Sequence, residues 1–186
     1  MEPTMKHPFN VRSFFTSRET RNIGSGLQLW RGYFQSVRPA VGRMLINIDI
    51  STGIMYKPGP LLDLCLEYLD KPHPNALTPR LGFPDRERLR LQRFISGIRV
   101  LTTNSGVGEG VQRRPRVVKK LSSAGANDLT FTMREGGSMT VSNYFRQNRN
   151  SPLQFPDVIC VEVCPSIFSS FSILFTYQYD RSARVR

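Results

Sequence analysis

The stretch from Ile98 to Val163 constrains the fold most, because short strand-like segments alternate in it with turns. It opens with Ile98, Val100 and Thr102 spaced two residues apart, as on one face of a strand. A loop with three glycines follows, and then a basic run over residues 113–120 that carries five Lys or Arg side chains. Cations on strands, with aromatic side chains near them, suit the phosphates and bases of single-stranded nucleic acid. The alternative is a solvated strand edge whose charges prevent aggregation.

The aromatic side chains of this stretch come from its second half. Residues 128–133 form an extended segment that carries Phe131, and a glycine turn leads from it to a short helix. Thr140 suits the N-cap of that helix, on which Tyr144 and Phe145 share one face. Helical spacing alone is typical of core residues, so core packing and ligand contact both stay open for Phe131 and Tyr144.

The chain before Ile98 predicts a hairpin and two helices. Residues 27–37 and 42–50 alternate as strands joined over residues 39–42, with Trp30 as a core anchor. Asp49 and Ser51 are expected to be turn residues after the second strand.

The two helices are expected at residues 60–69, after Pro58-Gly59-Pro60, and at residues 84–96. The arginines of the second helix fall mostly on the side away from its apolar stripe: Arg86, Arg88, Arg90 and Arg93. Such a charged face is either solvated surface or a contact for a nucleic-acid backbone.

The charge of the chain favours polyanionic partners. The formal net charge is +12 and the isoelectric point is about 10.4, which favours nucleic acid first and an anionic membrane surface second. No apolar run approaches the roughly 20 residues of a membrane span, and no signal-peptide pattern opens the chain, so we expect a cytoplasmic protein. The three cysteines, Cys65, Cys160 and Cys164, lack zinc-site spacing and are expected to be reduced and buried.

Catalytic residues are not evident in the sequence. His7 and His73 each lie beside a proline in a predicted loop, where neither is poised as a general base. The acidic residues are scattered, without a pair arranged to hold magnesium. We therefore expect no enzyme activity, no metal and no cofactor.

Several motifs resemble the Argonaute family in its fungal form. Trp30–Pro39 (WRGYFQSVRP), Met44–Ser51 (MLINIDIS) and Tyr56–Pro60 (YKPGP) resemble Argonaute linker 1. Residues 98–163 resemble the PAZ domain, with Thr140–Phe145 (TVSNYF) and Leu153–Pro156 (LQFP) as its best matches.

The resemblance implies an α+β fold. It consists of a β-hairpin linker with a helix, followed by a PAZ-type, OB-like small β-barrel with an inserted strand–helix clamp at residues 128–148. The implied domains are the tail of an Argonaute N-terminal domain (1–26), linker 1 (27–59), PAZ (60–163) and a divergent tail (164–186). No Mid or Piwi domain is recognised, which implies a truncated Argonaute-like protein without slicer activity.

The function implied by the resemblance is recognition of the 3′ end of a small guide RNA in RNA silencing. Phe131 and Tyr144 match two aromatic residues of the family's pocket, and Arg113 and Arg116 match two basic backbone contacts. Asn104 replaces a pocket histidine, and Arg149 replaces a tyrosine of the helix motif. The candidate RNA-binding residues are Asn104, Arg113, Arg114, Arg116, Phe131, Tyr144 and Arg149.

The implied partners are single-stranded or 3′-overhang small RNA, together with silencing-complex proteins, and not a membrane. Alternatives are a protein-interaction fragment or an Argonaute remnant with only ionic RNA binding, and, third, a small basic nuclease. The tail after Val163 does not resemble the family's closing segment. We expect residues 171–177 to form one strand beside residues 158–163, which would reduce 3′-end preference more than affinity.

Overall fold

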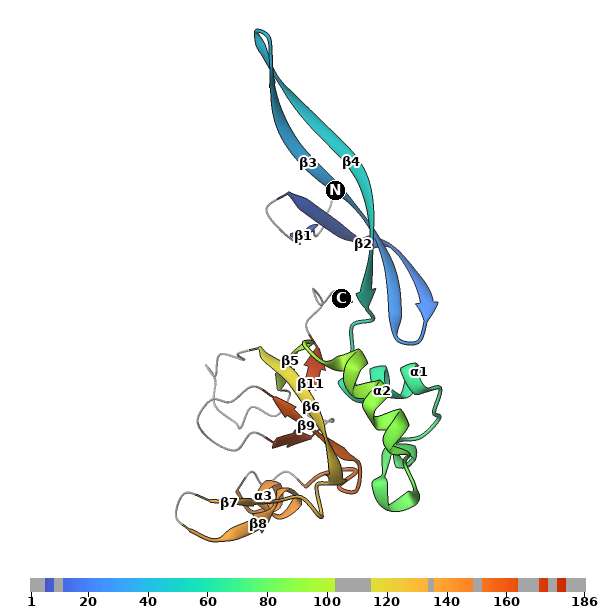
Figure 1. Cartoon of the computed structure of the whole chain (residues 1–186), viewed down its shortest axis with the longest axis vertical. Helices are drawn as coiled ribbons and strands as arrows, with labels where there is room; N and C mark the ends of the chain where they lie inside the picture. The colour runs from blue at the N-terminus through green and yellow to red at the C-terminus, as the bar shows by residue number, and fades with distance from the viewer. Residues whose placement is uncertain are drawn as a thin grey trace. The chain divides into compact units, whose positions relative to one another are not determined.

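A computed structural model describes residues 6–8, 12–102, 115–133, 136–148, 152–163, 171–173 and 177–179 (Figure 1). These residues fall into two compact units, and the chain passes from the first to the second between Lys57 and Pro58. In the part of the chain that is described, no helix is long and apolar enough to cross a membrane.

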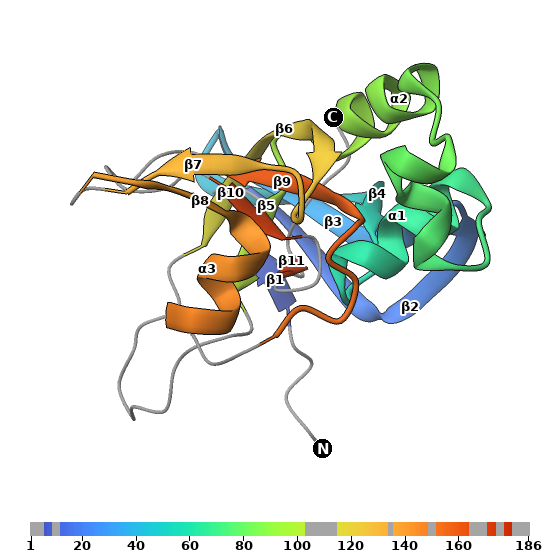
Figure 2. The same cartoon turned by 90° about the horizontal axis from the view of Figure 1, so that it is seen from below.

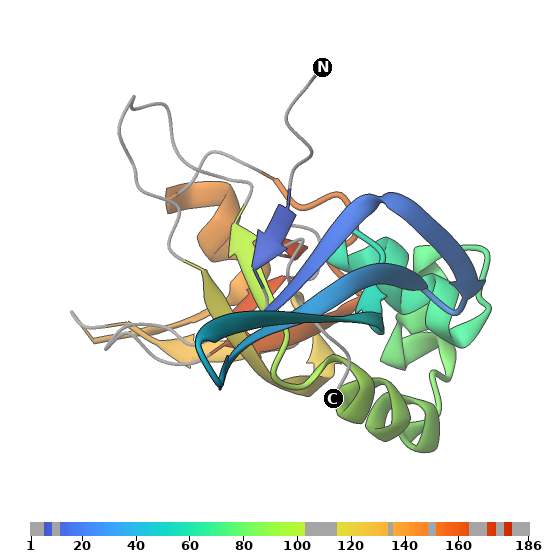
Figure 3. The ribbon, with the colours of Figure 1, turned by 90° about the horizontal axis from the view of Figure 1, so that it is seen from above.

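The first unit is one antiparallel sheet of four strands in sequence order. The strands are β1 (Lys6–Pro8), β2 (Ser13–Gly24), β3 (Leu27–Ala40) and β4 (Arg43–Tyr56). β3 and β4 pair without interruption from Leu27 opposite Tyr56 to Ala40 opposite Arg43, so the expected hairpin is confirmed. Figure 3 shows the two as neighbouring, twisted ribbons.

The second hairpin strand is longer than the sequence predicted. Asp49 and Ser51 do not form a turn, because they lie inside the ladder opposite Phe34 and Gly32. Isoleucines and threonine flank both residues, and these β-branched side chains favour continued strand over a local side-chain turn.

A small core anchors the base of this hairpin. Phe15, Trp30 and Met55 form a buried cluster, and Trp30 is only 2% exposed, as expected of a core anchor. The ring of Phe15 lies against Gly53, where an added Cβ would be 2.9 Å from the ring. Glycine at this position therefore leaves room for the aromatic ring against β4.

One face of the hairpin, in the half toward the turn between β3 and β4, is apolar and exposed. In β4, Ile46, Ile48 and Ile50 alternate with polar residues and face the same side of the ladder as Val37 and Tyr33 of β3. Ile46 is 69% and Ile50 88% exposed. This face contributes little to the core of its own unit among the described residues.

The second unit begins with helices. α1 spans Leu61–Leu69, and α2 spans Asp85–Ile95; short 3-10 turns, η1 (Pro74–Leu77) and η2 (Pro79–Leu81), lie between them. Both predicted helices are confirmed. Pro60 occupies the N-cap position of α1, just before its first turn. The buried side chains of these two helices share the core of the unit: Leu61, Leu62, Leu64, Cys65, Leu91 and Ile95.

A five-stranded antiparallel sheet forms the centre of the second unit, in the order β10-β9-β6-β5-β11. Its strands are β5 (Arg99–Thr102), β6 (Arg116–Gly125), β9 (Ile159–Val163), β10 (Phe171–Ile173) and β11 (Tyr177–Tyr179). Among the described residues β10 and β11 are the two edges of an open sheet. The α+β character is therefore established, whereas closure into an OB-like barrel stays a prediction.

The tail pairs differently from the single strand expected for residues 171–177. β10 does pair with β9, with Phe171 opposite Glu162, as predicted. β11 instead pairs with β5 at the other edge, with Tyr177 opposite Thr102. Two exposed sheet edges were available, and pairing satisfies backbone groups on both of them.

Candidate nucleic-acid interface

A hairpin and a helix leave the sheet at the carboxyl end of β6. β7 (Thr130–Thr132) pairs with β8 (Ser138–Thr140), and α3 (Val141–Asn148) follows directly. We call β7, β8 and α3 the clamp. Figures 1 and 2 show the three elements side by side at one end of the second unit. The Oγ1 of Thr140 accepts a hydrogen bond from the amide of Asn143 at 3.3 Å, which confirms Thr140 as the N-cap of α3.

The root of the clamp is fixed by backbone hydrogen bonds. The amide of Leu129 donates to the carbonyl of Gly125 at 2.9 Å, which closes the turn after β6. The amide of Val141 donates to Leu129 at 2.9 Å, and the amide of Ser142 donates to Ala126 at 3.0 Å. The first turn of α3 is thus tied to the same turn from which β7 departs, so the helix and the hairpin are held together.

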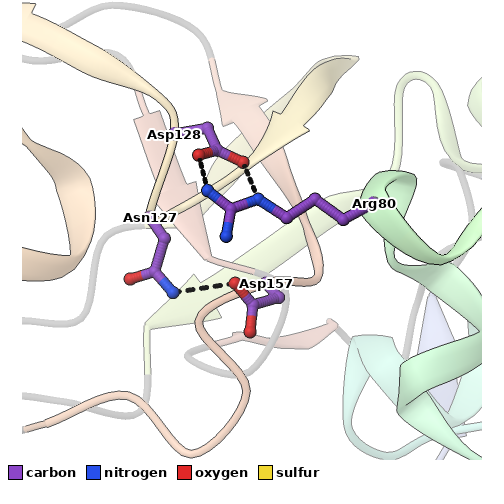
Figure 4. Close-up of polar contacts among 4 residues, drawn as sticks. All are labelled: Arg80, Asn127, Asp128 and Asp157. Carbon is purple, nitrogen blue, oxygen red and sulfur yellow. Dashed lines mark hydrogen bonds and ion pairs between the residues drawn. The ribbon is translucent and has the colours of Figure 1, made fainter.

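Side chains brace this turn from two directions (Figure 4). The guanidinium of Arg80, from η2, donates to both carboxylate oxygens of Asp128, with Nε 2.8 Å from Oδ2. This pairing raises the pKa of Arg80, because the carboxylate accepts hydrogen bonds from the charged form and attracts it. On the other side, the Nδ2 of Asn127 donates to the Oδ1 of Asp157 at 2.8 Å.

These bracing residues were not found from the sequence. Arg80 and Asp128 are separated by 48 positions, and neither lies in a motif that predicts the pairing. A close approach at Gly125 was also missed: an added Cβ there would overlap the backbone of Asp157. The only local signal was the turn-prone pair Asn127-Asp128 after a strand.

An apolar cluster lies beneath the clamp. Ala126, Val141 and Cys160 are buried, and the side chains packed against them are Leu129, Phe131, Phe145 and Leu153. Burial raises the pKa of the Cys160 thiol to about 12, against a smaller opposing effect of its hydrogen bond with Ser122. The cluster gives the clamp a packed, apolar base.

Two of the predicted binding residues meet on this base. The rings of Phe131 and Tyr144 are in edge-to-face contact, with centroids 5.4 Å apart and planes at 80°. Tyr144 also meets Phe145 edge to face at 5.9 Å. Phe131 and Tyr144 are both partly exposed, so they combine a core contact with ring surface that a base or sugar can reach.

Of the predicted basic residues, the structure describes Arg116, and this residue lies far from the clamp. Arg116 is the first residue of β6, where it pairs in register with Val100, whereas the clamp follows the last residue of that strand. A strand rises about 3.3 Å per residue, so nine steps separate Arg116 from Gly125 by up to about 30 Å. The remaining predicted contacts lie outside the described residues: Asn104, Arg113, Arg114 and Arg149.

Metal binding has no support in the described part of the chain, which contains no group of three or more His, Cys, Asp or Glu side chains that could hold an ion. Cys65 and Cys160 are both buried and reduced, as expected for two of the three cysteines. Cys164 lies outside the described residues.

Two protein-family models match this chain. The Argonaute linker 1 domain matches residues 11–57, and the PAZ domain matches residues 67–171. Neither of these regions is a catalytic domain. This agrees with the expectation that the chain is not an enzyme.

Curated relatives give the same picture. The chain is 31% identical over 160 residues to protein argonaute of Schizosaccharomyces pombe, covering 82% of this chain and 18% of that protein. It is also 31% identical over 162 residues to protein argonaute 14 of Oryza sativa, covering 86% of this chain and 15% of that protein. The chain thus spans less than a fifth of the length of these relatives.

Solved structures also resemble it. A Drosophila Ago PAZ domain in complex with 3′-end 2′-O-methylated RNA is 27% identical, with a TM-score of 0.52 over 66% of this chain and 98% of that one. Kluyveromyces polysporus Argonaute with a guide RNA reaches a TM-score of 0.58 over 98% of this chain and 22% of that one. At 14% identity, the second likeness concerns the fold alone.

Proposed function

This chain belongs to the Argonaute family, and from that premise we propose that its PAZ region binds the 3′ end of a small RNA. Relatives support the choice of ligand. One similar structure is a Drosophila PAZ domain with 3′-end 2′-O-methylated RNA, and another is described as the structural basis for 3′-end recognition by the Drosophila Argonaute 2 PAZ domain.

The observation that carries the proposal is the contact of Phe131 with Tyr144. One ring comes from the hairpin and the other from the helix, so a ligand that touches both is gripped by two separate elements. The backbone bonds at the clamp root set the spacing of these elements before any ligand arrives. Such preorganisation reduces the ordering that binding has to supply.

In this mechanism, aromatic rings bind the terminal nucleotide and basic side chains bind phosphates. Phe131 and Tyr144 take the terminal nucleotide against their exposed ring surface, where stacking is tolerant of base identity. Arg116 contacts a phosphate further along the strand, consistent with its place at the far end of β6. The other proposed contacts are those that the resemblance implies: Asn104, Arg113, Arg114 and Arg149.

We further propose that this binding serves RNA silencing in the cytoplasm, with silencing-complex proteins as additional partners, and that the sheet is completed to an OB-like barrel. The rival function is ionic RNA binding without recognition of an end. It has one specific support, the +12 net charge, which attracts any RNA.

Competition between two RNAs tests the proposal. Both have the same sequence; one ends in a free 3′ hydroxyl and the other carries a bulky group on that hydroxyl. The PAZ match continues to residue 171, past Val163 where the tail was expected to diverge, so we expect end preference to be retained, unlike the expectation from the tail sequence. A preference of tenfold or more, about 1.4 kcal/mol, supports end recognition. Equal affinity for the two RNAs would leave ionic binding as the function.

A further inference from the structure

A stripe of arginines lies on α2, away from the clamp. Arg86, Arg90 and Arg93 follow one another at i, i+4 and i+7, a spacing that places them on one face of a helix. All three side chains are exposed. The stripe extends about 10 Å along the helix axis, at 1.5 Å per residue. We call these three residues the arginine face.

The carboxylates of α2 do not neutralise this face. Asp85 pairs with Arg88, with 2.9 Å between Oδ1 and Nε, and Glu87 pairs with Lys71, with 3.4 Å between Oε2 and Nζ. Within the described ranges, neither Arg86 nor Arg93 has a carboxylate partner. The helix therefore presents uncompensated positive charge on this face, while its two acidic side chains are already engaged.

Arg90 is held in position by aromatic rings. Its guanidinium carbon lies 5.2 Å from the centroid of the Tyr68 ring, and its Nε donates to the Tyr68 hydroxyl at 3.3 Å. Tyr68 in turn stacks on Phe94, with centroids 3.7 Å apart and planes at 8°. A guanidinium fixed in this way loses less side-chain freedom when it binds a phosphate.

The positive surface continues from α2 onto β6. The Oγ of Ser96, at the end of α2, donates to the carbonyl of Lys119 at 3.5 Å, and the Oε1 of Gln92 accepts from the amide of Leu121 at 3.0 Å. Lys119 is exposed on that strand, whereas its neighbour Lys120 pairs with Glu162. Lys119 therefore adds a cation beside the carboxyl end of the arginine face.

The arginine face and the clamp are separate surfaces of the second unit. Figures 1 and 2 both show α2 and α3 apart from one another, with β6 running between them. A ligand on the arginine face would not occupy the ring surface of Phe131 and Tyr144. A long RNA, in contrast, could contact both surfaces at once.

We propose that Arg86, Arg90 and Arg93, with Lys119, form a second RNA-binding site that contacts phosphodiester groups upstream of the 3′-terminal nucleotides. Binding at this site is independent of base sequence, because its side chains offer only cationic donors to the RNA backbone. The position of this second site upstream of the RNA end rests on the proposed function of the clamp. Contact of the site with the RNA backbone is independent of that function.

The test compares the chain with a triple variant, Arg86→Gln/Arg90→Gln/Arg93→Gln, in titrations of a long RNA at several salt concentrations. Glutamine keeps the helix propensity and removes three charges. Loss of three phosphate contacts should lower the magnitude of the slope of log K against log salt by about 2, from roughly 0.7 per phosphate on a single strand. A tetranucleotide that reaches only the clamp should bind the variant and the parent chain equally.

Two further variants control for charge and for folding. Arg21→Gln/Arg38→Gln/Arg43→Gln removes three exposed charges from the first unit and should leave the slope nearly unchanged. Arg86→Lys/Arg90→Lys/Arg93→Lys keeps the charges and should restore most of the slope. Overlapping circular dichroism melts would show that the variants are folded.

The outcomes separate this site from the clamp. An unchanged slope in the Gln variant, or an equal loss in the control variant, overturns the second site. Loss of end preference in the parent chain, with the Gln effect intact, removes the proposed function and leaves the second site standing. Anionic vesicles of phosphatidylserine are the last arm: if the Gln variant loses vesicle binding and no RNA affinity, the face is a membrane contact and the proposal is wrong.

Discussion

Arg80 and Asp128 form a two-point ion pair that joins η2 to the turn at the root of the clamp. The two residues lie 48 positions apart, and the pair links the helical segment to the clamp. Both side chains are substantially exposed, so water and salt weaken the attraction. The pair therefore acts on the orientation of the turn more than on the stability of the whole chain.

The first prediction concerns the Arg80–Asp128 ion pair. Arg80→Gln should increase amide hydrogen exchange at Leu129 and Val141, two of the three amides that tie the clamp root, because the turn loses its brace. The melting temperature should change little. Arg31→Gln is the matched control, since it breaks an exposed ion pair with Glu19 in the first unit instead. Unchanged exchange at both amides would show that the backbone bonds alone set the clamp.

The second prediction concerns the aromatic pair. Phe131→Ala and Tyr144→Ala should each weaken binding of a 3′-hydroxyl RNA by about 1–3 kcal/mol, the range for losing one stacked ring. Fluorescence titration measures the affinity of each variant. Phe145→Ala provides the contrast, because Phe145 packs on the apolar cluster and its loss should appear as lower stability.

The variants of the pair need a folding control, because both rings also touch that cluster. Far-ultraviolet circular dichroism and a urea titration establish the folded fraction at the titration temperature. A folded double variant, Phe131→Ala/Tyr144→Ala, with wild-type affinity would exclude these rings from the RNA site.

Sequence periodicity predicted the elements whose partners are close along the chain. The β3–β4 hairpin and both α1 and α2 appeared at their expected places, because alternation and helical spacing are local signals. Thr140 marked the start of α3 correctly for the same reason. The extent of β4 past Asp49 was missed, since pairing along the full length of β3 outweighs the turn preference of that residue.

Local sequence patterns did not predict contacts between residues that are far apart in the chain. The divided tail, in which β11 pairs with β5, depends on which sheet edge is available and not on the tail residues alone. In the candidate site, Phe131 and Tyr144 could be named from the sequence because β7, β8 and α3 are contiguous and carry recognisable motifs. Their bracing by Arg80 left no trace in the local sequence, because the pair is made in three dimensions only.

The third prediction concerns the close approach at the clamp root. In Gly125→Ala the new methyl group would overlap the backbone carbonyl of Asp157, and backbone cannot move aside as a flexible side chain can. Overpacking of this kind costs about 1–3 kcal/mol of the free energy of unfolding. Urea unfolding measures it, with Ser123→Ala, an exposed change on the same strand, as the control. Equal midpoints for the two variants would contradict the close packing.

The fourth prediction concerns the exposed face of the hairpin. Ile46→Thr, Ile48→Thr and Ile50→Thr should each change the free energy of unfolding by less than about 0.5 kcal/mol, as is usual for surface positions. Threonine keeps the β-branched shape that favours a strand. Trp30→Ala, in the buried cluster of the same sheet, should cost about 3–5 kcal/mol. Large losses from the isoleucine variants would mean that this face is covered.

The last prediction concerns the buried thiols. Burial raises the pKa of Cys65, and it raises the pKa of Cys160 to about 12. The thiolate is the reactive form, so neither residue of the native chain should be alkylated by iodoacetamide at about pH 8, while both react in urea. Mass spectrometry of the digested protein assigns the label to each site. Rapid labelling of Cys160 in the folded chain would contradict its burial.

The same pKa shift makes stability depend on alkaline pH. An unfolded thiol ionises near pH 8.5, whereas folded Cys160 keeps its proton up to about pH 12. The stabilisation is therefore complete below about pH 8.5 and declines as the pH rises toward 12, by at most about 1.4 kcal/mol per pH unit for one proton. Urea titrations from neutral to alkaline pH should show a steeper decline for the parent chain than for Cys160→Ala, which has no thiol to ionise. Parallel declines would mean that Cys160 ionises as easily in the folded chain as in the unfolded one.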